Sequence, residues 1–295
     1  MQPRIVVTIP AYNEEKNLGK VISSVKEEMT KQRYNYRILV VDDGSTDKTA
    51  AVAKRLGAIV RSHPKNYGLA ETFKTEIETC LKEGFDIIVH FDADGQYSAA
   101  EIPKLIREVQ GGADLVLGSR IKGTIEDMPA IKLAGNKAFS RVVSNISGLP
   151  ISDAQTGFRA FTKEVAQRIP ITSNYTYTQE QIIRAAKAKF RIVEVPAHFA
   201  KRDGQSRLMR NPFHFALRAG VNLIRIWRDY EPLRFFGWIG AISMIIGLIL
   251  GLPLLYLYIT TGTISSRVPT AILSAVFILT GVQIVLFGFL ADMRH

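Results

Sequence analysis

Residues 37–47 read RILVVDDGSTD, and the change from an apolar run to an acidic loop within this stretch decides the fold class. Consecutive apolar residues of this kind are typical of a strand buried on both faces, as in a parallel sheet. Similar runs occur at 4–9, 58–61, 86–91 and 114–118. Helical patterns alternate with them at 15–31, 47–56, 69–83 and 99–110. This order predicts a doubly wound α/β domain with a mostly parallel sheet.

Polar and mostly acidic segments follow the predicted strands. In open α/β sheets, ligands bind outside the carboxyl ends of the strands, so these segments are the candidates for a site. They are PAYNEE at 10–15, DDGSTD at 42–47, DADGQ at 92–96 and Ser119-Arg120. For Ser45 and Asp47, a structural role in a turn and in the cap of the following helix is as good an explanation as a role in the site.

Asp92 and Asp94 form a candidate metal pair. Side chains two residues apart project to the same side of an extended backbone. Several carboxylates around one crevice repel one another, so a cation or hydrogen-bond donors should share the site. A carboxylate pair that leaves room for water and phosphate oxygens suits Mg²⁺ or Mn²⁺.

Composition removes several classes of protein. Hydrophobic residues make up 47% of the 295 residues and charged residues 22%, which excludes intrinsic disorder. The single cysteine, Cys80, excludes a disulfide scaffold and a cysteine-based zinc site. No G-x-G-x-x-G or Walker A pattern follows a predicted strand, which argues against dinucleotide and P-loop sites.

Two long apolar runs near the C-terminus, 235–259 and 268–291, contain no charged residue. Each is long enough to cross a hydrocarbon core of about 30 Å as a helix, although two buried core helices are the alternative. Two spans would form a hairpin and place both flanking segments on one side of the membrane. We therefore divide the chain into a catalytic domain at 1–210, an amphipathic helix at 211–234 and a transmembrane hairpin at 235–295.

The segment before the first run is basic. Residues 201–234 contain eight lysines and arginines and three acidic residues, a net charge of 8 − 3 = +5. By the positive-inside rule this side is cytoplasmic, and the chain opens on a strand-like run without the features of a signal peptide. Residues 212–231 resemble an interfacial helix with a basic face, the alternative being a helix packed on the first domain. Lipid headgroups explain this charge better than nucleic acid does, so we expect no nucleic-acid partner.

The order and spacing of these motifs carry a family resemblance. The segments PAYNEEKNL, VVDDGSTDKT, NYGL, DADGQY and LGSR resemble family 2 inverting glycosyltransferases of the GT-A fold, which is Rossmann-like. The later segments SDAQTGFRAF, TYTQE, EVPAHF and KRDGQSRL, with the hairpin, are similar to polyprenyl-phosphate glycosyltransferases, notably archaeal dolichol-phosphate mannose synthases. The resemblance covers about residues 4–210. Ala185 follows Gln181-Ile-Ile-Arg184 in place of the tryptophan of processive synthases, which argues against a polysaccharide synthase.

The resemblance implies roles for individual residues. A nucleotide would contact the group Pro10, Tyr12, Glu14, Asp43 and Asp92. Asp92, Asp94 and Gln96 match the metal and diphosphate motif, with Asp94, Arg120 and Arg202 as the catalytic residues. An acceptor phosphate would contact the group Arg120, Lys132, Arg202, Ser206 and Arg207.

The implied reaction is transfer of a hexose from a nucleotide sugar to dolichyl or another polyprenyl phosphate at a cell membrane. GDP-mannose is the favoured donor, and UDP-glucose and UDP-N-acetylglucosamine are alternatives. A phosphate monoester with a second pKa near 6 is already largely dianionic at pH 7 and needs no general base. A hydroxyl acceptor would need one, for which Asp153 is the candidate. A membrane module with a dead nucleotide site is disfavoured by the intact acidic motifs.

Overall fold

The computed structural model describes residues 2–126, 128–173, 177–201, 221 and 224–293. The chain divides into two compact units, residues 1–219 and residues 220–295, which are considered separately.

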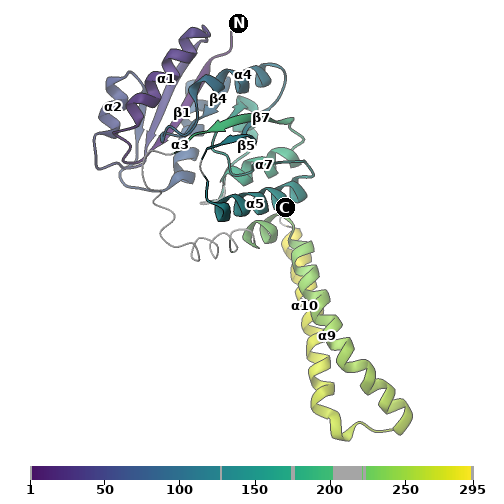
Figure 1. Cartoon of the computed structure of the whole chain (residues 1–295). Helices are drawn as coiled ribbons and strands as arrows, with labels where there is room; N and C mark the ends of the chain where they lie inside the picture. The colour runs from purple at the N-terminus through teal and green to yellow at the C-terminus, as the bar shows by residue number, and fades with distance from the viewer. Residues whose placement is uncertain (1, 127, 174–176, 202–220, 222–223, 294–295) are drawn as a thin grey trace. The chain divides into compact units, whose positions relative to one another are not determined.

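The first unit is built on one seven-stranded sheet with the order β3-β2-β1-β4-β6-β5-β7 (Figure 1). The strands are β1 Ile5–Ala11, β2 Tyr36–Asp42, β3 Ile59–Ser62, β4 Ile87–His90, β5 Leu115–Ile125, β6 Arg159–Thr162 and β7 Ile192–Phe199. Strands β1 to β4 pair in parallel, as do β5 and β7. Strand β6 lies antiparallel between β4 and β5. The predicted α/β fold with a mostly parallel sheet is therefore confirmed, with one antiparallel insertion.

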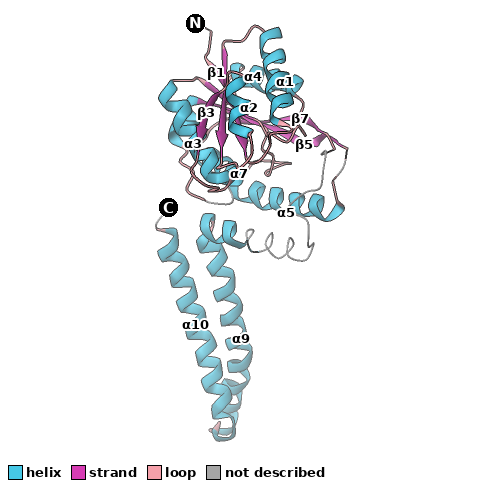
Figure 2. Cartoon of the chain, turned by 90° about the vertical axis from the view of Figure 1, so that its left-hand side faces the viewer, coloured by secondary structure: helices cyan, strands magenta, loops and turns pink. Residues whose placement is uncertain are grey.

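Helices cover both faces of this sheet (Figures 1 and 2). They are α1 Leu18–Lys31, α2 Thr49–Arg55, α3 Leu69–Glu83, a short 3-10 turn at Ala99–Glu101, α4 Ile102–Gln110, α5 Ala130–Ser147, α6 Lys163–Arg168 and α7 Tyr177–Lys187. Alternate residues of β1 face opposite layers. Ile5, Val7 and Ile9 join the core formed with α1 and α4. Thr8 faces α3 instead, where its hydroxyl donates to Glu76 at 2.8 Å.

The second unit contains two antiparallel helices, α9 Pro232–Thr261 and α10 Val268–Asp292 (Figures 1 and 2). Both have a mean hydropathy of 2.3, and only 11% and 17% of their most apolar windows are buried. Such exposed apolar surface is not that of soluble core helices. The predicted runs at 235–259 and 268–291 are helices long and apolar enough to cross a membrane.

Small residues spaced seven apart form the contact between α9 and α10. A side chain at Gly240 would meet Gly281 O at 2.6 Å, and one at Gly247 would meet Ser274 O at 2.9 Å. Ser274 also donates its hydroxyl to Gly247 O at 2.7 Å. Close backbone approach through small residues is a recurrent way of packing helices in lipid.

Half of the predicted amphipathic helix at 211–234 lies outside the described residues. Residues 224–230 are helical, with Arg225 and Arg228 exposed and Ile226 buried. The ring of Trp227 packs edge-on against Phe235 at 5.4 Å between centroids. The interfacial position of this segment stays a prediction.

Candidate active site

The loops that follow β1 and β2 are joined by hydrogen bonds between side chains and backbone. Ser45 accepts from Asn13 N at 2.9 Å, and Asn13 Oδ1 accepts from Thr46 N at 2.8 Å. Asp47 accepts from Thr49 N at 2.9 Å at the start of α2. Ser45 and Asp47 therefore have structural roles, which the sequence left open.

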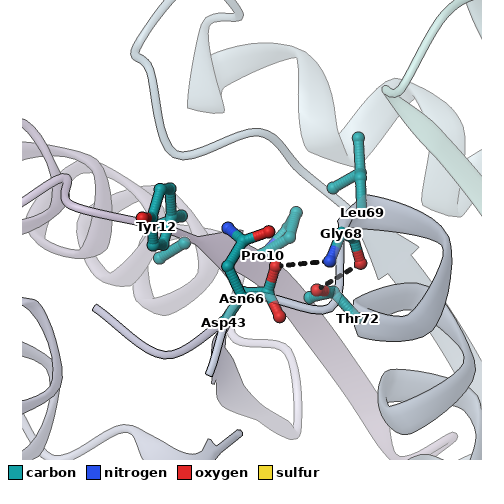
Figure 3. A pocket seen from close by; sticks show the side chains of 8 residues that line it. Pro10, Tyr12, Asp43, Asn66, Gly68, Leu69 and Thr72 are labelled. Carbon is teal, nitrogen blue, oxygen red and sulfur yellow. Dashed lines mark hydrogen bonds between the residues drawn. The ribbon is translucent and has the colours of Figure 1, made fainter. Parts of the chain in front are cut away.

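Asp43 is buried beside a pocket of about 230 Å³ (Figure 3). Its Oδ1 accepts from Tyr67 N at 2.9 Å and its Oδ2 from Gly68 N at 2.8 Å. The pocket is lined by Pro10, Ala11, Tyr12, Asp43, Asn66, Gly68, Leu69 and Thr72. Three of the predicted nucleotide residues, Pro10, Tyr12 and Asp43, are thus brought together at one cavity at the carboxyl ends of β1 and β2. Glu14 is not among the lining residues; it lies in the same loop, where its carboxylate accepts from Asn17 at 3.1 Å.

His63 is a neighbour of this pocket that the sequence analysis did not select. Its Nδ1 lies 2.7 Å from Asp43 Oδ1, and its Nε2 lies 2.9 Å from Thr75 Oγ1. The imidazole therefore fixes the orientation of the Asp43 carboxylate. The contact joins residues 20 apart in the chain, and no local pattern marks it.

Asp92 and Asp94 follow β4, as predicted, and their charges interact. Burial raises the pKa of Asp92 to about 6, and the Asp94 carboxylate adds to the effect. A carboxylate held this way favours a bound cation, because the cation offsets both burial and repulsion. Within the described residues no group of three or more acidic, histidine or cysteine side chains is placed to hold a metal ion. A pair of hard oxygen donors nevertheless fits Mg²⁺ or Mn²⁺, which keep water and phosphate ligands.

The segment 156–159 packs directly behind Asp92. A side chain at Gly157 would lie 2.7 Å from Asp92 Oδ2 and 2.8 Å from Oδ1, so only glycine allows this approach. Arg159 is fully buried and ties the segment to α7, because its Nη1 donates to Thr178 O at 3.2 Å and to Gln181 Oε1 at 2.9 Å. It also donates to Thr156 O. The TGFR part of the SDAQTGFRAF segment thus shapes the position of Asp92.

Gln96 bridges the metal loop and the end of β7. Its Nε2 donates to Ala200 O at 3.1 Å, and its backbone carbonyl accepts from Ala200 N at 2.8 Å. Its Oε1 is an amide oxygen and is the atom of Gln96 that would ligate a hard cation.

Arg120 donates three hydrogen bonds to Asp153. Its Nε donates to Asp153 Oδ2 at 2.7 Å and its Nη2 to Oδ1 at 2.8 Å, while its backbone N donates to Oδ2 at 3.0 Å. Burial lowers the pKa of Arg120, but the hydrogen bonds that it donates to Asp153, together with the nearby groups Tyr97, Asp153 and Asp92, outweigh burial and hold that pKa above its ordinary value. Asp153 is fully buried, and both of its oxygens are occupied. This carboxylate is not positioned as a general base.

The remaining predicted residues are placed as follows. Lys132 lies in the first turn of α5 and is partly buried. Arg202, Ser206 and Arg207 lie outside the described residues. Tyr177, which the sequence analysis did not select, is buried and packs against Phe73 at 4.7 Å between ring centroids.

Comparison with known proteins identifies the class. The family model Glycosyl transferase family 2 matches residues 6–169, and the chain belongs to that family. The chain is similar to a dolichyl-phosphate hexose transferase of Haloferax volcanii, with 32% identity over 78% of this chain and 96% of the relative. It is also similar to a polyprenol monophosphomannose synthase of Mycolicibacterium smegmatis, with 32% identity over 68% of this chain and 78% of the relative.

Two further matches bear on the donor and the fold. A UDP-N-acetylglucosamine–dolichyl-phosphate N-acetylglucosaminyltransferase of Methanococcus voltae is 33% identical over 65% of this chain and 84% of the relative. Glucosyl-3-phosphoglycerate synthase of Mycobacterium tuberculosis, solved with Mn²⁺, uridine diphosphate and phosphoglyceric acid, matches with a TM-score of 0.57. That match has 20% identity over 74% of this chain and 78% of the other, and it supports the fold. The chain is therefore a glycosyltransferase with the GT-A type of fold.

Proposed function

We propose that this protein transfers a hexose from a nucleotide sugar to a polyprenyl phosphate, with inversion at the anomeric carbon. The observation that carries the proposal is the Arg120–Asp153 pair. The one carboxylate that the sequence offered as a general base is buried and held by three N–H groups of Arg120. A hydroxyl acceptor needs a base, whereas a phosphate acceptor does not. The names of the relatives agree with a lipid phosphate.

The residues divide the work as follows. Pro10, Tyr12 and Asp43 would hold the nucleoside part of the donor in the pocket, with Glu14 beside it. Asp92, Asp94 and Gln96 would hold Mg²⁺ or Mn²⁺, which supplies charge stabilisation to the departing diphosphate. We assign Asp94 the main role in holding the metal ion, because the Asp92 carboxylate is constrained by its close contact with Gly157.

The acceptor phosphate would be held by cationic side chains. Arg120 would offer the N–H groups that Asp153 leaves unused, and Lys132, Arg202, Ser206 and Arg207 would add further donors. These donors position the phosphate for attack on the anomeric carbon and require no proton transfer. GDP-mannose is the preferred donor because one relative is named for mannose transfer. The name of another relative makes UDP-N-acetylglucosamine the competing donor.

The membrane arrangement is part of the proposal. An α9–α10 hairpin anchors the protein, and residues 1–210 would lie on the cytoplasmic face. The exposed Arg225 and Arg228 precede α9 on that side, as the positive-inside rule requires. Residues 211–234 would lie along the interface.

The test is transfer of radiolabel from a panel of nucleotide sugars to dolichyl phosphate, with Mn²⁺ or with a chelator. We expect label in the lipid phase from one donor, and only with metal. Asp94→Ala should lower transfer by at least about 100-fold, because metal charge stabilisation is worth several kcal/mol, while the variant stays folded. Normal transfer by folded Asp94→Ala would contradict the assignment of Asp94 as a metal ligand. Transfer to a sugar hydroxyl with none to lipid phosphate would overturn the acceptor class.

A further inference from the structure

Arg120 lies at the start of an irregular stretch of β5. Strand β5 pairs regularly with β7 as far as Ser119, and the pairing resumes at Thr124. Between these two points β5 advances by 124 − 119 = 5 residues, whereas β7 advances from Pro196 to His198, by 198 − 196 = 2. Such a bulge takes its residues out of regular strand pairing, and bulges beside active sites re-aim a side chain. The orientation of Arg120 therefore depends on side-chain contacts.

The side chain that orients Arg120 belongs to a segment that is neither helix nor strand. Asp153 lies in the connection between α5 and β6, residues 148–158. In this connection the N–H groups of Ile151 and Ala154 donate to serine hydroxyls of α5, each at 3.0 Å. The two N–H groups between them, which include that of Asp153 itself, need another acceptor, because backbone donors away from water are paired in folded proteins.

That acceptor is the carboxylate of Glu194 on β7. Its Oε1 accepts from Ser152 N at 2.9 Å and from Asp153 N at 3.1 Å. Its Oε2 accepts from the Ser152 hydroxyl at 2.9 Å and lies 2.9 Å from Lys122 Nζ. The Glu194 side chain is 3% exposed and that of Lys122 is 47% exposed. A carboxylate is stable at such burial when donors surround it, and these four contacts supply them.

The same contacts reach the residue just before Arg120. Ser119 Oγ lies 2.7 Å from Ser152 Oγ and accepts from Lys122 N at 3.1 Å. Strand β7 lies beside β5 at the edge of the sheet (Figure 1). A side chain of β7 thus links the sheet to the connection that carries Asp153 and to the bulge that carries Arg120.

We propose that Glu194 is a positioning residue for the acceptor: it fixes Asp153, and through Asp153 the Arg120 guanidinium, relative to the sheet. The inference rests on the proposed function, because it concerns the Arg120 N–H groups that would bind the acceptor phosphate. Glu194 acts through the hydrogen bonds that it accepts and not through its charge, since an ion pair with a half-exposed lysine contributes little. Donor binding does not depend on Glu194, which is not among the residues that line the nucleotide pocket.

Two conservative variants separate the hydrogen bonds from the charge. Glu194→Gln removes the charge but keeps the length of the side chain and one oxygen for the two N–H groups. Glu194→Asp keeps the charge, but its carboxylate ends about one C–C bond, or about 1.5 Å, short of Ser152 and Asp153. Hydrogen bonds cannot span that gap, so the connection must shift, and misplacement by about 1 Å costs about 100-fold in a catalysed reaction. We expect Glu194→Asp to lower kcat/KM for dolichyl phosphate by about 10- to 100-fold with an unchanged KM for the nucleotide sugar, and Glu194→Gln to stay close to wild type.

Calorimetry repeats this comparison without turnover. The full chain in micelles, with Mn²⁺ and a nucleoside diphosphate, is titrated with farnesyl phosphate, and Glu194→Asp should bind this probe at least about tenfold more weakly than wild type and Glu194→Gln do. Met29→Ala controls for lost stability. Met29 is fully buried near the end of α1, which returns the chain to the edge of the sheet opposite the site. This variant should melt at a lower temperature and bind farnesyl phosphate normally.

The outcomes separate the two proposals. Wild-type affinity for farnesyl phosphate in Glu194→Asp, or an equal loss in Glu194→Gln and Glu194→Asp, would overturn the role of Glu194. An equal loss in Met29→Ala would overturn it too, because acceptor binding would then follow stability alone. A wild-type protein that shows the expected differences in binding but transfers no sugar to dolichyl phosphate would refute the proposed function and leave the role of Glu194 standing. Absence of farnesyl phosphate binding in wild type would refute both.

Discussion

Replacement of Gly157 by alanine tests how the Asp92 carboxylate is positioned. The new Cβ would lie 2.7 Å from Asp92 Oδ2 and 2.8 Å from Oδ1, whereas ordinary contacts begin at 3.4 Å. To reach an ordinary contact distance, the Asp92 carboxylate must therefore move away from the new Cβ by 3.4 − 2.7 = 0.7 Å. Gly157 does not have a positive φ, so alanine adds no backbone strain, and the contact with Asp92 is the expected consequence.

A displacement of this size is large for a metal ligand, because Mg²⁺ demands near-ideal geometry at about 2.0–2.1 Å. Misplacement by about 1 Å costs about 100-fold in a catalysed reaction. We expect Gly157→Ala to weaken Mn²⁺ binding at least about tenfold and to lower transfer by about 10- to 100-fold, with an unchanged melting temperature. Mn²⁺ affinity is measured by electron paramagnetic resonance, which needs no turnover.

Two controls separate this mechanism from general damage. Gly19→Ala on α1 would place its Cβ 3.7 Å from Val52 Cγ1, an ordinary contact, and should leave Mn²⁺ affinity unchanged. In an Asp92→Ala background the carboxylate is gone, so Gly157→Ala should have no further effect on Mn²⁺ affinity. Wild-type affinity in Gly157→Ala, or an equal loss in both backgrounds, would refute the reasoning.

Three further predictions concern separate parts of the molecule. The pKa of Asp92 in the metal-free protein is raised from 3.8 to about 6, so its ionisation costs stability as pH rises through this window. Asp92→Asn should therefore raise the free energy of unfolding by up to about 3 kcal/mol at about pH 8 and not at about pH 4, in denaturant titrations with chelator; equal effects at both pH values contradict this. His63→Leu removes a partner of Asp43 and should weaken nucleoside diphosphate binding about tenfold by calorimetry without lowering kcat at saturating donor. Gly281→Leu would bring a side chain within 2.7 Å of Gly240 O and should lower thermal stability of the hairpin in micelles, while Leu279→Ala, exposed on α10, should not.

The sequence predicted the strands and the loops of the site because both depend on local patterns. Apolar runs bury strands, and a parallel sheet places their carboxyl ends at one edge, so PAYNEE, DDGSTD and DADGQ had to meet. The contacts that orient these loops depend on residues distant in sequence. Gln96 bonds to Ala200, 104 residues away, and Arg159 reaches α7 from β6. No periodicity marks such pairs, so the sequence analysis did not find them.

The hairpin sequence contains a regular spacing of small residues that the sequence analysis did not interpret. Gly240 and Gly247 are seven residues apart, as are Ser274, Gly281 and Gly288. A seven-residue repeat of small residues places one stripe on each helix, and the structure packs these two stripes together. Antiparallel β6 is different, because its four residues Arg159–Thr162 resemble any short buried strand and the direction of pairing is not a local property.

The charges of the site explain why a cation is expected at one place only. The sequence analysis argued that several acidic loops around one crevice need cations or hydrogen-bond donors. The structure supplies donors for most of them: His63 and two backbone N–H groups for Asp43, and Arg120 for Asp153. Asp94 accepts from Gln96 N at 3.1 Å, whereas burial and the charge of Asp94 raise the pKa of Asp92. A divalent ion would offset both the burial of Asp92 and its repulsion from Asp94, so we expect the ion between these two carboxylates. Metal dependence of transfer and the Gly157→Ala effect should therefore share one cause.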